Sequence, residues 1–283
     1  MTVADALARY ADEAGPKRAA IVKRFIEAEG WHAEAGSALS RHLRTLQARG
    51  LRPGTVDLAY RTIRAFYRRV GLPAPRVAGY RYDPEDARRY ALAPDAIAAM
   101  IDGARSGRTQ PLDTAYLALS TVYGMRAVEM ARVQARDIDR AGERIYLRTA
   151  KGGPSRWIWL PPPIASVLPD RWPVGDERDL TARVEASFAH VWDAAIDAER
   201  PRGVAWHAIR RALHRDLAAQ GVPEPDRKRF GRWSASRGMA ERYAAPNLTV
   251  GLERVEPARL AEEGTPEHDA AVWQHHPYLG LWA

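Results

Sequence analysis

Apolar residues recur at helical spacing throughout the N-terminal part of the chain. Four segments show this spacing, and each is bounded by Gly or Pro: residues 2–14, 16–30, 37–50 and 53–71. In the fourth segment the apolar side chains share one face, and Arg61, Arg64 and Arg68 form a stripe on another. The pattern predicts a small unit built only of helices, with one basic helix face.

The hydrophobic pattern changes in the middle of the chain. Residues 76–91 are rich in Pro, Gly and charge, which predicts a linker. Further on, apolar residues alternate with others on both sides of a Lys-Gly-Gly-Pro turn, which predicts a β-hairpin with Ile145, Leu147, Ile158 and Leu160 on one face. Helical spacing occupies the rest: residues 93–104, 111–124, 127–134, 181–200, 206–220 and 225–243.

These elements predict a mainly α protein with a small β-sheet, an α+β fold. We expect a helical domain over residues 1–75, a linker over 76–91, a mixed α/β domain over 92–250 and a tail over 251–283. The length of 283 residues and the 46% hydrophobic content suffice for cores in both domains.

Charge points to an anionic partner. The net charge is +8, and residues 15–71 alone hold twelve Lys or Arg against four Asp or Glu. Such a surface suits a phosphate backbone, although a merely solvated face has the same composition. The chain has no Cys, which excludes disulfides, thiolate metal sites and a Cys nucleophile. With no membrane-length apolar run and no signal peptide, we expect a cytoplasmic, nucleoid-associated protein.

The tail differs from the rest in charge. Residues 251–283 hold six Asp or Glu and two Arg, and they end in VWQHHPYLGLWA. This segment either packs on its own chain or docks on a neighbouring subunit, and the sequence leaves both open. We interpret its histidines as packing residues rather than metal ligands: His268, His275 and His276.

A cationic face is predicted on the helix that begins with WHAIRRAL. His207 and Arg210 are three residues apart and share this face, and Arg211 lies near it. Ile209 and Leu213 fall on the other side, so we expect the cationic face to point away from the core. Most helical histidines of this kind lie at the surface, and only converging cationic groups would change that interpretation.

Other candidate residues lie in three separate stretches. Arg126 follows the Gly124 break at a predicted helix start, and Glu129 is placed to hold its side chain. Lys151 lies at the hairpin tip, and Tyr243 precedes Ala-Ala-Pro. Cationic side chains without an acidic metal-binding cluster suit a phosphate that is stabilised by direct charge and attacked by a side-chain nucleophile. The structural alternatives are an Arg–Glu pair, a turn lysine and a packing tyrosine.

The order GMR, AK in a hairpin, HAIR, GRW and RY resembles the signature of the tyrosine recombinase (phage integrase) family. The motifs span residues 92–246, and residues 1–75 resemble the family's core-binding domain in type only. The resemblance implies a helical core-binding domain followed by a mixed α/β catalytic domain. It also implies no cofactor and no metal, a double-stranded DNA recombination site as partner, a homotetramer on paired sites and possible accessory DNA-bending proteins.

The resemblance implies a role for each motif residue. Tyr243 would attack the scissile phosphate, Arg126 and Arg210 would clamp its oxygens, and Lys151 would protonate the leaving 5′-oxygen. His207 would act as acid, base and hydrogen-bond donor. Glu129 would support Arg126. Weaker contacts with DNA are expected from the remaining basic residues: Arg61, Arg64, Arg68, Arg211 and Arg232.

One motif departs from the family pattern. The family places His or Trp directly after a Gly, whereas here Arg232 stands between Gly231 and Trp233. The gap from Trp233 to Tyr243 is also slightly long. We expect Trp233 to fill the His/Trp position, with Arg232 as the alternative.

Two further classes of function remain open. An integrase-like protein without catalysis would bind DNA as a regulator or architectural factor. A type IB topoisomerase-like enzyme or a protelomerase would share the phosphotyrosine chemistry but give relaxed or hairpin products instead of recombinants.

Overall fold

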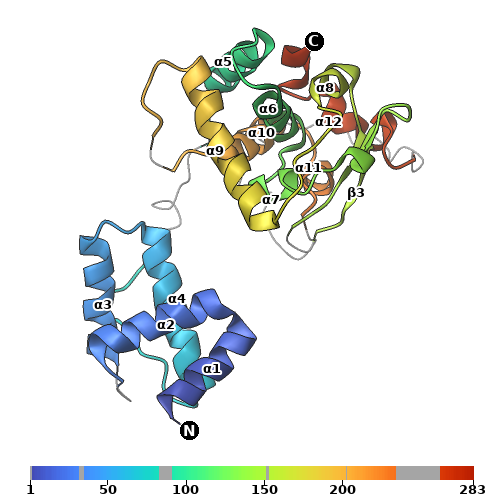
Figure 1. The fold of residues 1–283 in the computed structure, drawn as a ribbon. Helices are drawn as coiled ribbons and strands as arrows, with labels where there is room; N and C mark the ends of the chain where they lie inside the picture. The colour runs from blue at the N-terminus through green and yellow to red at the C-terminus, as the bar shows by residue number, and fades with distance from the viewer. Residues whose placement is uncertain (1, 32–34, 83–90, 151–152, 202, 234–261) are drawn as a thin grey trace. The chain divides into compact units, whose positions relative to one another are not determined.

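A computed structural model of the chain describes residues 2–31, 35–82, 91–150, 153–201, 203–233 and 262–283. The chain divides into two compact units, residues 1–89 and 90–283 (Figure 1). Each unit has its own hydrophobic core. The boundary between them falls inside the predicted linker. No helix within these described ranges is long and apolar enough to cross a membrane.

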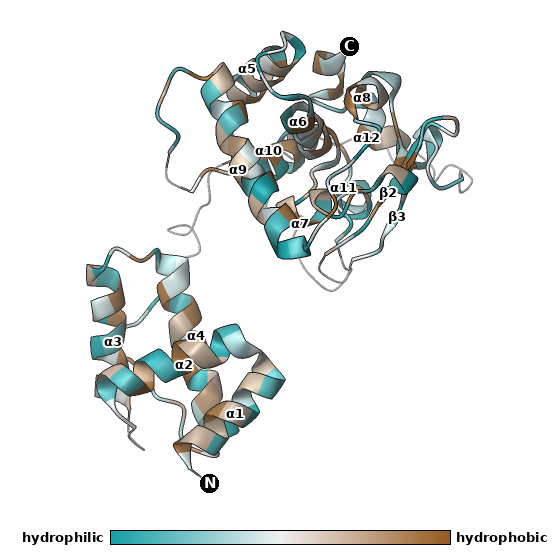
Figure 2. Cartoon of the chain, viewed as in Figure 1, coloured by the Kyte–Doolittle hydropathy of each residue, from teal (hydrophilic) through white to brown (hydrophobic). Residues whose placement is uncertain are grey.

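The described residues of the first unit form four helices with a shared aromatic core. A capping box between Thr2 and Asp5 starts the first helix. Tyr10 and Phe66 pack edge to face with ring centres 5.3 Å apart. Apolar and polar residues alternate around these helices, as the brown and teal bands in Figure 2 show. The predicted helical unit is confirmed, with bounds α1 (Val3–Ala14), α2 (Pro16–Glu29), α3 (Gly36–Ala48) and α4 (Pro53–Arg69).

The second unit is built around α6 (Pro111–Tyr123), which is buried on every side from Asp113 to Tyr123. A helix without a polar face belongs in a protein interior, and three long helices cover this one. They are α5 (Pro94–Arg105), α9 (Glu177–Ala195) and α10 (Trp206–Ala219). Shorter helices complete this part: α7 (Ala127–Met130), η1 (Ala135–Asp137), α8 (Pro162–Val167) and α11 (Glu224–Phe230).

A three-stranded antiparallel sheet lies at the periphery of this unit (Figure 1). Its strands are β1 (Ile138–Asp139), β2 (Arg144–Leu147) and β3 (Arg156–Trp159). Ile145 pairs with Ile158 across β2 and β3, and the four predicted inward residues are all fully buried. The predicted hairpin is therefore confirmed, and β1 adds a strand that the sequence pattern had not indicated. The mainly helical fold with a small sheet is confirmed as well.

Three predicted helices have different bounds in the structure. The helix predicted over residues 181–200 begins at Glu177 and ends at Ala195. The helix predicted over residues 127–134 ends at Met130. The helix predicted over 225–243 ends at Phe230, because Arg232 takes a left-handed conformation with φ 53° that no α-helix continues. Residues 234–243 of that prediction lie outside the described residues.

Residues 262–283 pack against their own unit. They form η2 (Pro266–Asp269), α12 (Ala270–Gln274) and η3 (Leu279–Trp282). Trp282 Nε1 donates to Thr121 Oγ1 at 3.1 Å, and the Tyr278 hydroxyl donates to the Asp216 carboxylate. The first of the two alternatives for the tail is thus seen for these residues, and docking on a neighbouring subunit stays a prediction.

His276 anchors this C-terminal segment to α6. Its Nε2 lies 2.9 Å from the Val122 carbonyl oxygen, and its Nδ1 accepts the backbone N–H groups of Tyr278 and Leu279. Only the neutral ring protonated at Nε2 satisfies all three contacts. Burial lowers the pKa of His276 to about 4. The interpretation of His276 as a packing residue is confirmed.

Candidate active site

Arg126 stands where the central helix gives way to the short helix α7. Gly124 ends α6 with φ 59°, and a Cβ at this position would meet Leu213 Cδ2 of α10 at 3.2 Å. Glycine suits this position in two ways, because it takes the left-handed backbone without strain and because it leaves room for the Leu213 side chain. The break places Arg126 at the N-cap of α7 with its side chain partly exposed.

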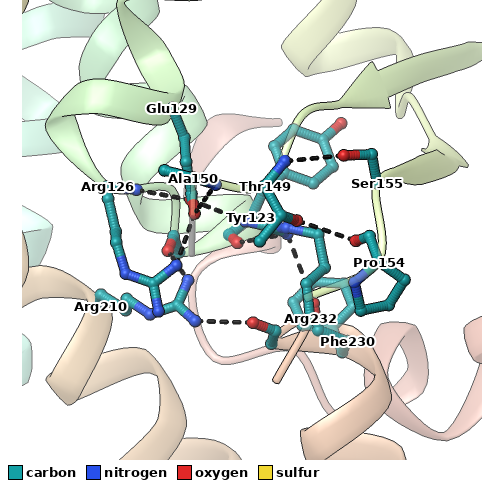
Figure 3. Close-up of polar contacts among 12 residues, drawn as sticks. Tyr123, Arg126, Glu129, Thr149, Ala150, Pro154, Ser155, Arg210, Phe230 and Arg232 are labelled. Carbon is teal, nitrogen blue, oxygen red and sulfur yellow. Dashed lines mark hydrogen bonds and ion pairs between the residues drawn. The ribbon is translucent and has the colours of Figure 1, made fainter. Parts of the chain in front are cut away.

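Glu129 holds Arg126 in place through both its backbone and its side chain. The Arg126 N–H donates to Glu129 Oε2 at 3.0 Å, and Arg126 Nη1 donates to Oε1 at 2.5 Å. Arg232 Nη2 donates to Oε2 at 3.2 Å, and the Ala150 N–H approaches Oε1 at 3.4 Å (Figure 3). We call Glu129, Arg126, Arg232 and Ala150 the Glu129 cluster.

The charge of Glu129 is stabilised although its side chain is fully buried. Burial by itself raises the pKa of this carboxyl, but the guanidinium groups of Arg232, Arg210 and Arg126 outweigh it and lower the pKa to about 2. The carboxylate is therefore ionised at neutral pH. It joins α7, the base of the β2–β3 loop and the end of α11 at one point.

Arg210 lies deep inside the unit rather than on an outer face. Its side chain is fully buried on α10, Nη1 donates to the Gly124 carbonyl, and Nη2 donates to the Gly231 carbonyl at 2.7 Å. The expectation that the cationic face of this helix points away from the core is wrong for Arg210. The reason is that α10 packs against both α6 and α11, so that two of its sides are covered.

His214 was not among the predicted site residues. It is fully buried one turn after Arg210, and its ring centre lies 4.4 Å from that of Trp233. Burial, reinforced by the surrounding arginines, lowers the pKa of His214 well below its ordinary value, so the ring is neutral. The spacing of four residues from Arg210 was the one signal in the sequence that placed it near the site.

Arg232 and Trp233 follow α11 and contact different groups. Arg232 pairs with Glu129 and approaches the carbonyls of Tyr123 and Phe230 at 3.4 Å (Figure 3). Trp233 stacks near His214, and the Arg210 guanidinium lies 5.6 Å from its ring centre. Full burial of the Arg232 side chain argues against its predicted contact with DNA.

The β2–β3 loop reaches the same place. A Cβ on Gly153 would lie 2.0 Å from the carbonyl oxygen of Arg232, so only glycine allows this approach. Lys151 follows Ala150 and lies outside the described residues. Tyr243 also lies outside them. The flanks of the Lys151 position are therefore held against the Glu129 cluster from both sides.

His207 is partly buried in the first turn of α10. Arg211 is also partly buried, and its Nε donates to the His207 carbonyl at 3.2 Å. The described parts of the chain contain no group of three or more His, Asp or Glu placed to hold a metal ion.

Comparison with known proteins gives the fold. No family model and no curated protein matches the chain. A lambda integrase dimer bound to a COC′ core site matches 90% of this chain and 99% of that chain, with a TM-score of 0.62 at 16% identity. The Tn1549 transposon integrase in complex with transposon right end DNA matches 88% of this chain and 96% of that chain, with a TM-score of 0.63 at 14% identity. The chain has the tyrosine recombinase fold.

A third solved structure has the same fold. The chain of a lambda integrase tetramer bound to a Holliday junction matches 90% of this chain and 80% of that chain, with a TM-score of 0.62 at 15% identity. The resemblance noted in the motifs is thus confirmed at the level of the recombinase fold. At such low identity the likeness concerns the fold, and the roles of individual residues are argued from their geometry.

Within the recombinase fold, the helical first unit carries the predicted basic stripe on α4. Arg61 and Arg68 are exposed. Arg61 pairs with the buried Asp57 at 2.6 Å, and Arg64 is partly buried with its guanidinium 5.1 Å from the ring centre of Tyr60. The stripe therefore contains one exposed arginine, Arg68, for which no ion pair is described, and two whose contacts also stabilise the helix.

Proposed function

We propose that this protein is a site-specific DNA recombinase that cleaves and rejoins DNA through a 3′-phosphotyrosyl intermediate. The observation that carries the proposal is the convergence of the motif segments. Arg126 and both flanks of the Lys151 position meet at the Glu129 cluster, and Arg210 and Trp233 pack against each other beside it, in a chain with the tyrosine recombinase fold. Substrates are double-stranded recombination sites in the cytoplasm, and four copies act on paired sites.

The reaction is a transesterification. The Tyr243 oxygen attacks the scissile phosphorus, the bond from phosphorus to the 5′-oxygen breaks, and the tyrosine remains linked to the 3′-phosphate. Lys151 supplies a proton to the leaving oxygen, while His207 accepts the tyrosine proton and donates to the phosphate. Since the phosphodiester energy is kept in the new bond, neither a metal nor a nucleotide cofactor is needed. A 5′-hydroxyl from another strand then reverses the step.

Charge stabilises this transition state. Arg126 is the partly exposed arginine of the Glu129 cluster and is held by two hydrogen bonds to Glu129. A preorganised donor of this kind contributes on the order of 10²–10³ in rate. Arg210 ties the loop before Arg126 to the loop before Trp233, so it organises the phosphate site from behind. Its side chain is fully buried, as that of Arg232 is, so its predicted clamping role requires that a phosphate displace one of these carbonyls.

The test is covalent trapping on a nicked suicide duplex made from the DNA that flanks the gene. Wild-type protein should form an adduct that survives SDS, and Tyr243→Phe should form none while binding the same duplex within a few-fold. An adduct that persists in Tyr243→Phe places the nucleophile elsewhere. Absence of an adduct on every duplex that the wild-type protein binds would favour an integrase-like DNA-binding protein without catalysis.

Product analysis separates the related reactions. Recombinant DNA from paired sites supports the proposal. Site-independent plasmid relaxation by a monomer would instead indicate a type IB topoisomerase-like enzyme, and hairpin ends would indicate a protelomerase.

A further inference from the structure

Arg232 has a conformation that costs free energy in two ways. Its backbone is left-handed, a conformation that is sterically unfavourable for any residue with a Cβ. Its guanidinium is withdrawn completely from solvent, and the burial lowers the pKa of this group from its ordinary value. A strained backbone and a buried charge persist only where the surrounding interactions offset their cost.

The hydrogen bonds to Glu129 show what the buried Arg232 side chain does. Each carboxylate oxygen has two donors: Arg126 Nη1 and the Ala150 N–H at Oε1, and the Arg126 N–H and Arg232 Nη2 at Oε2. Arg232 is thus the donor to Oε2 that comes from outside α7 (Figure 3). Without it, the buried carboxylate keeps Arg126 as its one ion-pair partner among the described residues and can rotate with it.

We propose that Arg232 is a positioning residue, which holds the Glu129 carboxylate and through it fixes Arg126 and the base of the Lys151 loop for phosphate binding. This inference rests on the proposed function. It also assigns different roles to Arg232 and Trp233, because Arg232 donates to Glu129 while Trp233 packs with Arg210 and His214. The pair Gly231-Arg232 therefore does not place an arginine on the phosphate.

The experiment is a double-mutant cycle on the full chain with four variants: Arg232→Met, Arg232→Lys, Glu129→Gln and the double variant Glu129→Gln/Arg232→Met. The readouts are the single-turnover cleavage rate and the dissociation constant on the same nicked duplex. We expect Arg232→Met to lose at least about 100-fold in rate and less than about threefold in affinity. Arg232→Lys should recover most of the rate.

The double-mutant cycle tests whether Arg232 affects cleavage through Glu129. The double variant should be no slower than Glu129→Gln alone, because Arg232 has nothing left to hold. If the two losses multiply, Arg232 acts independently of Glu129 and the proposal is wrong. If Arg232→Met instead weakens binding and reduces its salt dependence, the residue contacts DNA and the proposal is likewise wrong.

A pH profile adds a readout that loss of packing would not change. The charged groups that face Glu129 are Arg126, Arg210 and Arg232, and Arg232 lowers its pKa most strongly. Removing Arg232 raises that pKa, so the acid limb of the cleavage rate should move to higher pH in Arg232→Met. An unchanged acid limb contradicts the proposal.

Controls distinguish failure of the proposed function from failure of the proposed role of Arg232. A wild-type protein that never cleaves refutes the proposed function, whereas an active wild-type with an equally active Arg232→Met refutes only the role of Arg232. If Arg232→Met does not fold, judged by circular dichroism, the comparison of Glu129→Gln with the double variant decides, because neither leaves an unpaired buried carboxylate.

Discussion

Arginines in the two units serve different purposes. Among the described residues of the second unit, four arginines are buried, and each donates to a backbone carbonyl or a carboxylate: Arg156, Arg210, Arg227 and Arg232. On α4 of the first unit, Arg61 and Arg68 are exposed, and Arg68 has no described ion pair. Burying a guanidinium is costly, so the buried set is explained by the loops that it fixes. The exposed set remains accessible to a phosphate backbone, and arginine content alone distinguishes neither.

The largest expected difference is between two adjacent arginines of α10. Arg210→Ala removes the donor to the Gly124 and Gly231 carbonyls, so it should slow cleavage by about 10³-fold or more and destabilise the second unit by about 3–5 kcal/mol. Arg211→Ala is the matched control and should cost less than about tenfold in rate. Single-turnover cleavage and urea unfolding measure both. Equal losses would show that burial does not separate these residues.

A second comparison uses two arginines that share one carboxylate. Arg156 is 4% exposed and pairs with Asp269 at 3.0 Å, whereas Arg229 is 43% exposed and pairs with Asp269 at 3.2 Å. Arg156→Ala removes the buried partner and leaves the buried Asp269 carboxylate with the more exposed Arg229, so it should cost up to about 3–5 kcal/mol. Arg229→Ala should cost about 1 kcal/mol or less. Thermal melting and proteolysis of the C-terminal segment report the effect, and the reverse order would overturn the comparison.

Acid should loosen the C-terminal segment through His276. The pKa of His276 is about 4 in the folded protein and 6.5 ordinarily, so the unfolded chain binds the proton first. Its contribution to stability is complete above pH 6.5 and is lost as pH falls toward 4, by about 3 kcal/mol in total. In the His276→Gln variant, the melting temperature should depend less on pH between pH 6.5 and pH 4. A slope that survives the substitution would assign the effect to other groups.

The smallest effect is expected from the exposed arginine of the basic stripe. Arg68→Ala should leave the free energy of unfolding within about 0.5 kcal/mol. It should reduce the salt dependence of DNA binding by about one phosphate contact, a slope change of about 0.9. Lys23→Ala, at an exposed lysine of α2, serves as the control. If both variants change the slope equally, the stripe on α4 has no special role.

Periodicity predicted the elements well where one face is apolar. The four helices of the first unit and the alternation of Ile145, Leu147, Ile158 and Leu160 follow directly from the pattern. It failed where a backbone conformation decided the outcome. Nothing in the letters Gly-Arg-Trp shows that Arg232 takes φ 53° and ends the helix predicted over 225–243.

For the candidate site, too, the sequence predicted some features and missed others. Motif order and spacing identified Arg126, Glu129, Arg210 and Trp233, and the structure brings them together. Spacing could not reveal that Arg210 is buried, because that depends on α6 and α11 packing on two sides of α10. Nor could it distinguish Arg232 from a surface arginine, since its partner Glu129 lies 103 residues earlier in the chain.

The sequence by itself determined the helical first unit, the hairpin, the basic charge and the order of the motif residues, because periodicity, composition and spacing are local properties. The tertiary structure decided which cations face solvent and which are withdrawn into the Glu129 cluster. It also decided that residues 262–283 return to α6 and α10. Burial and ion pairing depend on segments that are distant in sequence, and only the packed chain brings them within hydrogen-bonding distance.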